Sequence, residues 1–197
     1  MTADGKIEIM IASSVYNFED QLNEICGLFE QMGYHPINSH YKTLPTHPGK
    51  SNKDNCLEAA KNCDCFFGIV RPFYGTGIIG DTSITHEEMK TAIALKKPRW
   101  FVAHRDVRVA RVLLKQYRFD ADKKPIPDFK YKETSLLDDI RVIDMYDDTI
   151  QSNIKPEERI GHWTDEYFVL NDIKKVIHTQ FGDQKRILEI IKSMKAL

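Results

Sequence analysis

The sequence lacks the features that mark membrane and secreted proteins. No apolar run approaches the ~20 residues that a transmembrane helix requires. The first ten residues, MTADGKIEIM, have no basic region followed by a long apolar stretch, so we expect no signal peptide. Neither sign of charge is in excess, because 28 basic residues stand against 29 acidic ones. These absences predict a cytoplasmic protein with no membrane contact and no broad nucleic-acid-binding surface.

Cysteine is also scarce. Cys63 and Cys65 are spaced C-x-C, with no His or Cys partner at the spacing of a zinc site. Cys26 falls on the apolar face of the first expected helix, and Cys56 falls in the second. We therefore predict four buried free thiols in a reducing compartment, no metal site and no cofactor.

The first half of the sequence alternates strand patterns with helix patterns. The expected strands are 6–12, 34–37, 65–70 and 99–104, and the expected helices are 17–32, 52–62 and 85–97. Asn17 can cap the first helix, Gly33 can stop it, and Pro98 can end the third. Strands separated by helices of this length predict a mainly parallel sheet with right-handed crossovers. The expected fold is three-layer α/β, as in flavodoxin.

The second half departs from this alternation. We expect a helix at 107–117, a loop at 119–129, a strand at 141–145, an irregular stretch at 151–162 and an edge strand at 166–170. Asn171 and Asp183 can cap two final helices, 172–181 and 184–194. The length fits a single domain over residues 1–197, with core βα units in 1–105 and a decorated C-terminal half in 106–197.

Polar residues follow the first and third expected strands at the point where each strand ends. In flavodoxin-type order the strand order reverses between these two strands, and ligands bind in the crevice outside their carboxyl ends. Glu88 lies in the helix that follows the third strand. The candidate site residues are Ser13, Ser14, Tyr16, Arg71, Phe73, Tyr74, Gly75, Asp81 and Glu88.

Several of these segments together resemble a known family. The segment Ile9–Asp20 is similar to the opening of the DUF4062 family, where a strand ends in a paired serine and an acidic helix follows. Arg71–Thr76 is similar to the tyrosine-glycine turn of that family, and Ser83–Ala92 to its next helix opening. Lys97-Pro98 before a strand fits as well. The resemblance covers roughly residues 7–104.

The resemblance implies an activity. DUF4062 domains resemble TIR domains and nucleoside 2-deoxyribosyltransferases, and both of these can cleave an N-glycosidic bond. Both carry a glutamate near the start of the helix after the third strand, which matches Glu88. The stretch from Asp81 to Glu88 is similar to the deoxyribosyltransferase pattern, although it lacks the glycine before Thr85 and is one residue longer. The tryptophan that often precedes the glutamate in active TIR domains is absent.

The implied chemistry gives each candidate residue a role. A carboxylate at Glu88 would stabilise positive charge on the ribose as the bond to the base breaks. The helix start after Ser13 and Ser14 offers free N–H groups to phosphates, and Arg71 can add a bidentate contact. Phe73 or Tyr74 can stack on a nicotinamide or adenine ring.

Structural alternatives remain open for the same residues. Thr85 and Glu88 have the spacing of a capping box, in which Thr85 caps the helix and Glu88 reaches back to its N–H. Ser13 and Ser14 can be turn and cap residues, and Tyr16 can serve packing alone.

Two hypotheses for function follow. The first is a TIR-like nucleotide-processing enzyme that hydrolyses or cyclises NAD, as substrate and not cofactor, or a related nucleoside derivative. The resemblance places it in bacterial stress or phage defence, with a downstream effector protein as partner. The second is a non-catalytic module that binds a nucleotide signal or acts as an oligomerising scaffold. We expect at least a dimer, with loops 72–83 and 119–129 as contact surfaces.

Overall fold

The computed structural model describes residues 1–2, 4–75 and 77–195, and only the backbone of residue 79. Its centre is a five-stranded sheet in the order β2-β1-β3-β6-β7, and every pairing is parallel. The strands are β1 (Glu8–Ser13), β2 (His35–Ile37), β3 (Cys65–Val70), β6 (Arg99–His104) and β7 (Thr164–Tyr167). A separate small hairpin pairs β4 (Ile78–Ile79) with β5 (Thr82–Ser83). The expected flavodoxin-like strand order is confirmed.

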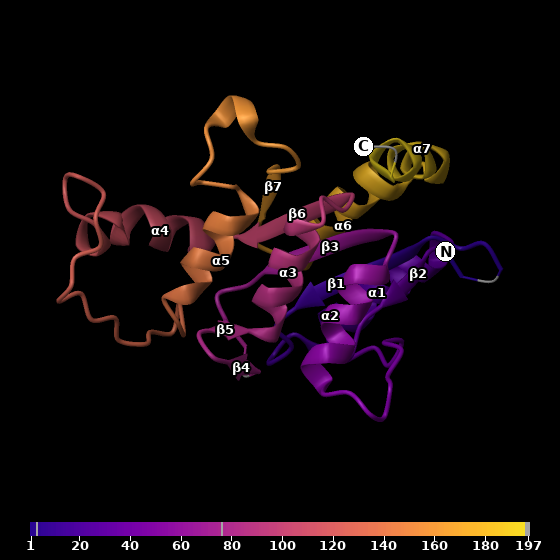
Figure 1. Cartoon of the computed structure of the whole chain (residues 1–197), viewed down its shortest axis with the longest axis horizontal. Coiled ribbons are helices and arrows are strands. Elements are labelled where there is room, and N and C mark those ends of the chain that lie inside the picture. Colours follow the sequence, from indigo (N-terminus) through magenta and orange to yellow (C-terminus); the bar gives the residue numbers. More distant parts are fainter. Residues whose placement is uncertain (3, 76, 196–197) are drawn as a thin grey trace.

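Helices cover both faces of this sheet (Figure 1). The first face carries α1 (Glu19–Gln31), α6 (Leu170–Phe181) and α7 (Gln184–Lys195). The second face carries α2 (Asn52–Asn62), α3 (Ile84–Ala94), α5 (Arg141–Thr149) and the start of α4 (Arg105–Arg118). A single 3₁₀ turn, Pro156–Glu158, interrupts the loop before β7. The three-layer α/β fold predicted from the sequence is therefore confirmed.

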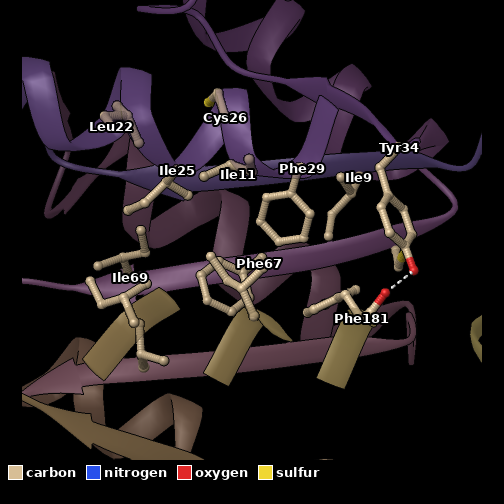
Figure 2. Packing of buried hydrophobic residues seen from close by; sticks show 14 of the residues in the cluster. Ile9, Ile11, Leu22, Ile25, Cys26, Phe29, Tyr34, Phe67, Ile69 and Phe181 are labelled. Carbon is tan, nitrogen blue, oxygen red and sulfur yellow. Dashed lines mark hydrogen bonds between the residues drawn. The ribbon is translucent and has the colours of Figure 1, made fainter. Parts of the chain in front are cut away.

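The core on the first face is built around aromatic rings (Figure 2). The rings of Phe29 and Phe181 meet edge to face at 5.0 Å, and those of Phe67 and Phe181 at 5.9 Å. The Tyr34 hydroxyl donates a 2.8 Å hydrogen bond to the Phe181 carbonyl. Phe181 thereby attaches the end of α6 to α1, β3 and the chain after α1.

On the second face, the sheet and α3 are in close contact at Gly68. At Gly68 in β3, an added Cβ would lie only 2.6 Å from the Phe101 ring and 3.2 Å from the Met89 methyl group. The missing side chain lets α3 approach the sheet closely. Glu88 precedes Met89, so this contact also sets the position of Glu88.

Most expected elements are observed, with one error of element type and several errors of bounds and caps. The strand predicted at 141–145 is wrong, because this stretch forms helix α5. The fifth place in the sheet belongs to β7, whose bounds lie two to three residues before the predicted 166–170. Asn17 does not cap α1: it adopts φ 55°, and the helix begins two residues later without a side-chain cap. Asn171 does not cap α6 either, because that helix begins at Leu170 and its N-cap is Val169. Gly33, at φ 85°, follows the end of α1 as expected.

No helix within the described ranges combines the length and the apolar character needed to cross a membrane. The four cysteines are free thiols, and all are buried as predicted. Burial raises the pKa of Cys26 and Cys56 to about 12 and that of Cys63 to about 11.

The ring cluster on the first face should dominate stability. We expect Phe181→Ala to lower the free energy of unfolding by about 3–5 kcal/mol, because a fully buried ring is lost and a cavity remains. Phe168→Ala is the matched control, since Phe168 is half exposed and should cost below about 1 kcal/mol. Urea unfolding measures both. Equal losses of unfolding free energy in the two variants would contradict the prediction that the ring cluster on the first face dominates stability.

Candidate functional site

A pocket of about 630 Å³ opens at the carboxyl ends of β1 and β2, between these strands and the starts of α2 and α3. Met10 and Ile11 of β1 belong to its lining. Most of the other lining residues come from three places: the end of β1 and the residues after it, the first turns of α2, and the start of α3. They are Ser13, Ser14, Val15, Tyr16, Asn52, Asn55, Cys56, Ser83, Ile84, Thr85 and Glu88. The loops after β2 and β3 supply Asn38, Ser39, Lys42, Leu44, Thr46, Gly75 and Gly77. The pocket therefore lies at the carboxyl edge of the sheet, where the loops after β1, β2 and β3 meet the starts of α2 and α3.

Glu88 is the most unusual group in the pocket. Its side chain is 6% exposed and reaches the lining from α3. Burial raises its pKa to about 8, and the neighbouring Cys56 thiol on α2 opposes this shift. No described cation pairs with it. At neutral pH this carboxyl group is therefore mostly protonated.

The start of α3 explains why Glu88 points inward. Ser83 is the N-cap, and its Oγ accepts a 3.2 Å hydrogen bond from the His86 N–H. The capping box expected from Thr85 and Glu88 is therefore wrong. Glu88 lies instead on the buried face of α3, together with His86, Met89 and Ala92. Glu87 lies outside the pocket, where Thr82 and Lys90 donate to its carboxylate.

Arg71 does not line the pocket, contrary to the prediction. Its Nη1 donates 2.9 Å hydrogen bonds to the carbonyls of Ser14 and Tyr16. Its guanidinium lies over the rings of Phe18, at 4.5 Å, and Phe73, at 5.1 Å. The reason is the alternation of side chains along β3: Arg71 continues the row that faces α1, whereas the pocket lies on the α2 and α3 side.

The paired serines have different partners. Ser14 Oγ donates a 2.7 Å hydrogen bond to the Phe73 carbonyl and so joins the loops after β1 and β3. Ser13 Oγ donates to the Ser14 carbonyl at 3.0 Å. Both serines reach the lining, as do Tyr16 and Gly75. Phe73 packs against Tyr16 behind them, with ring centroids 6.2 Å apart.

Tyr74 supports the pocket from behind and does not line it. Its hydroxyl accepts from the Ser83 N–H at 3.3 Å and lies 2.8 Å from His86 Nδ1. The hydroxyl proton therefore goes to Nδ1, which leaves His86 Nε2–H to donate to Asp148 of α5 at 2.8 Å. This buried chain joins the loop after β3 to α3 and α5. The expectation that Tyr74 lines the pocket is wrong, because its ring is directed into the second core.

Asp81 also lies outside the pocket. It is exposed, and its carbonyl accepts a hydrogen bond from Arg141. The residues missed by the sequence reasoning come from the loop after β2 and the start of α2: Asn38, Lys42, Asn52 and Asn55. Asn38 shapes that loop, since its Nδ2 donates to the Ile11 carbonyl at 2.8 Å. These residues could have been predicted from the topology, because the loop after the second strand leaves the same edge of the sheet as the loops after the first and third strands.

The charges around the pocket are few. Within the described part of the chain, Glu88 is the one carboxyl group and Lys42 the one basic side chain of the lining. The first turns of α2 and α3 bring the positive ends of two helix dipoles to the wall. The start of α1 is less open to an anion, because its N–H groups bind the Glu19 carboxylate and lower the pKa of that group. The described residues form no cluster of three or more His, Cys, Asp or Glu side chains suited to a metal ion.

The sequence matches the profile of the family described as "Domain of unknown function (DUF4062)" over residues 8–160. Among solved structures, the chain is similar to a 2-desoxiribosyltransferase from Leishmania mexicana, with 18% sequence identity and a TM-score of 0.40. That similarity covers 72% of this chain and 96% of the other. No curated protein matches the chain.

The observed cap leads to a stability prediction. We expect Ser83→Ala to lower the free energy of unfolding by about 0.5–2 kcal/mol, because the His86 N–H loses its partner. Thr85→Ala should have a smaller effect, since Thr85 does not cap the helix. Urea titrations of the two variants compare them directly. A larger loss in Thr85→Ala would restore the capping box.

Glu88 should make stability fall as pH rises. Its pKa is about 8 in the fold and near 4.5 without burial, so the folded state holds the proton more tightly across that window. The free energy of unfolding should therefore decrease with rising pH, by at most about 1.4 kcal/mol per pH unit. Glu88→Gln removes this contribution and should gain stability relative to the parent as pH rises. Thermal unfolding at pH 5 to 8 measures the difference, and two parallel curves would contradict it.

Proposed function

Because the chain belongs to the DUF4062 family, a domain of unknown function, its activity has to be argued from its pocket, and we propose that it cleaves the N-glycosidic bond of a nucleotide or nucleoside derivative. The observation that carries this proposal is Glu88, a carboxyl group without a charged partner, buried in a pocket at the carboxyl edge of the sheet. Such a group is costly to bury, and strongly perturbed carboxyl groups in clefts are typical of active sites.

Breaking a ribosyl–base bond leaves positive charge on the sugar. An ionised Glu88 beneath the ring would stabilise that charge or attack the anomeric carbon. Glu88 is only 6% exposed, and the low dielectric around a buried group strengthens this attraction. Water, or another hydroxyl of the same substrate, would then take the ribosyl group, giving hydrolysis or cyclisation.

The charges of the lining favour one class of substrate. A neutral base needs a proton as it leaves, which normally requires a second acid beside the carboxylate. The described lining has one carboxyl group and no histidine. A pyridinium base, already positive, leaves as a neutral molecule without a proton. Its charge would also lower the pKa of Glu88 and ionise it on binding. NAD is therefore the substrate to test first, with its phosphates at Lys42 and the starts of α2 and α3.

The second function, binding without turnover, is favoured by one observation. A carboxyl group with a pKa of about 8 is mostly protonated at neutral pH, and a protonated Glu88 can donate a hydrogen bond to a bound nucleotide. In that case the protein reads a nucleotide signal. The setting that the family resemblance suggests, bacterial stress or phage defence, fits either function.

The two functions are separated by incubating the purified protein with NAD and with neutral nucleosides and resolving the products by chromatography. We expect nicotinamide release from NAD. Glu88→Gln should lower kcat by about a hundredfold or more, equivalent to roughly 3 kcal/mol of barrier. Glu87→Gln is the matched control: it changes the neighbouring carboxyl group, which lies outside the pocket, and should keep the turnover.

The pH dependence distinguishes the two states of Glu88. If the ionised form acts, kcat/KM should rise with pH toward about 8, and a proton donor would give the opposite slope. Nucleotide binding measured by calorimetry, with no product from any substrate, would leave the binding function as the better account.

A further inference from the structure

The helix α4 exposes a row of apolar side chains. Its inner side buries Val107 and packs Ala110 and Leu114 against the second core. Its outer side leaves Val112 65% exposed and Leu113 62% exposed. Val109 and Tyr117 are exposed on the same helix. A helix that is apolar on both sides is expected to have a partner on its outer side.

This helix and the loop after it form an arm with strong positive charge. Residues 105–132 contain nine basic and four acidic residues, a net charge of +5, whereas the whole chain carries −1. Figure 1 shows α4 and this loop at the opposite end of the long axis from α7. The arm thus combines apolar surface and positive charge away from the pocket.

A groove of about 980 Å³ runs along this arm, where residues 119–126 fold back beside α4. Its apolar lining includes Val112, Leu113, Phe119 and Ile126. Lys115 and Lys123 also line it and form no ion pair with a described residue.

The acidic residues of the groove are already engaged. Asp147 pairs with Arg111 at 2.6 Å. Asp120 accepts the N–H groups of Asp122 and Lys124 within its own turn.

Arg118 of the groove lining pairs with Asp144, which lies outside the groove. Within the described lining, Lys115 and Lys123 therefore stand against the single unpaired carboxylate of Asp120. The remaining charge of the groove is therefore positive, and it lies beside apolar side chains.

We propose that this groove, called here the α4 groove, binds an acidic amphipathic helix of a partner protein. The apolar side chains of the partner's helix would lie on Val112, Leu113 and Phe119. The carboxylates of that helix would face Lys115 and Lys123. This is the helix-in-groove mode of recognition, with charge complementarity setting the preference for acidic partners. The proposal is independent of any activity in the pocket.

Other occupants fit less well. Two copies meeting through α4 would bring together two arms of net charge +5. Phosphate contacts would leave the apolar lining unused, so nucleic acid matches only half of the surface. A bilayer is flat, whereas the surface between α4 and residues 119–126 is hollow.

The test uses a labelled peptide as long as α4, 14 residues, with leucines at i, i+3, i+4 and i+7 and glutamates at most other positions. Fluorescence anisotropy should show saturable binding that weakens as salt is added. A second peptide with lysine in place of glutamate, and a third with serine in place of leucine, should not bind.

The matched variants locate the contact. The double variant Val112→Asp, Leu113→Asp should bind the acidic peptide at least tenfold less well, with its melting temperature nearly unchanged because both side chains are exposed. Val109→Asp makes the same change on the same helix outside the groove and should keep the binding.

Several results would overturn the proposal. One is failure of the acidic peptide to bind, and another is equally strong binding of the lysine peptide. A third is an equal loss of affinity for the acidic peptide in Val109→Asp and in the double variant. Each of these results contradicts binding of an acidic helix in the α4 groove. Binding of phosphatidylserine vesicles or duplex DNA that exceeds peptide binding would also overturn it. So would self-association in light scattering that the double variant abolishes.

Discussion

Burial of the sheet on both faces is the constraint on which the site depends. Each residue of β1 and β3 must face either the α1 layer or the α2 and α3 layer, and its neighbours in the strand face the other way. Two residues at the same edge of the sheet can therefore point to opposite faces and contact different helices. Arg71 continues the row on the α1 side, while Glu88 approaches from α3 on the opposite side. These two ionisable groups therefore lie on opposite sides of the sheet.

The two groups meet the cost of burial in different ways. Arg71 keeps its charge, because backbone carbonyls accept from its Nη1 and aromatic rings flank its guanidinium. Glu88 has no comparable donors, so it meets the same cost by holding a proton. The hydrogen bonds of Arg71 join the loops after β1 and β3, and the charge of Arg71 stays constant. Glu88 is instead a group whose charge can change when a ligand arrives, which is why the pocket, and not Arg71, is the centre of the proposed chemistry.

Much of the fold could be predicted because strand and helix periods differ clearly in the first half. The strands at 65–70 and 99–104 and the helix at 52–62 have the expected bounds. The stretch at 141–145 was misread because Val142 and Ile143 favour strands in isolation. Asp139, which accepts the Arg141 N–H at 2.8 Å, was the overlooked sign of a helix start.

The edge of the sheet that carries the pocket could be predicted better than the residues that line it. The edge of the sheet follows from topology, so Ser13, Ser14 and Glu88 could be grouped by their places relative to the strand ends. Arg71 and Tyr74 were misplaced because their faces depend on counting the alternation past the end of β3. The Ser83 cap was missed because Thr85 and Glu88 satisfy the same spacing rule. Such local ambiguities are resolved by packing, here by the contact of α3 with Gly68.

The pocket and the groups that support it come from different parts of the chain. Every lining residue lies between Met10 and Glu88, whereas the partner of His86 is Asp148 and the ring beside Phe29 and Phe67 is Phe181. Evolution can therefore act on the two separately. The second half of the chain must keep its buried core residues, the acceptor at Asp148 and the ring at Phe181, but none of its described residues lines the pocket. Changes on its exposed surface therefore leave the lining of the pocket unchanged.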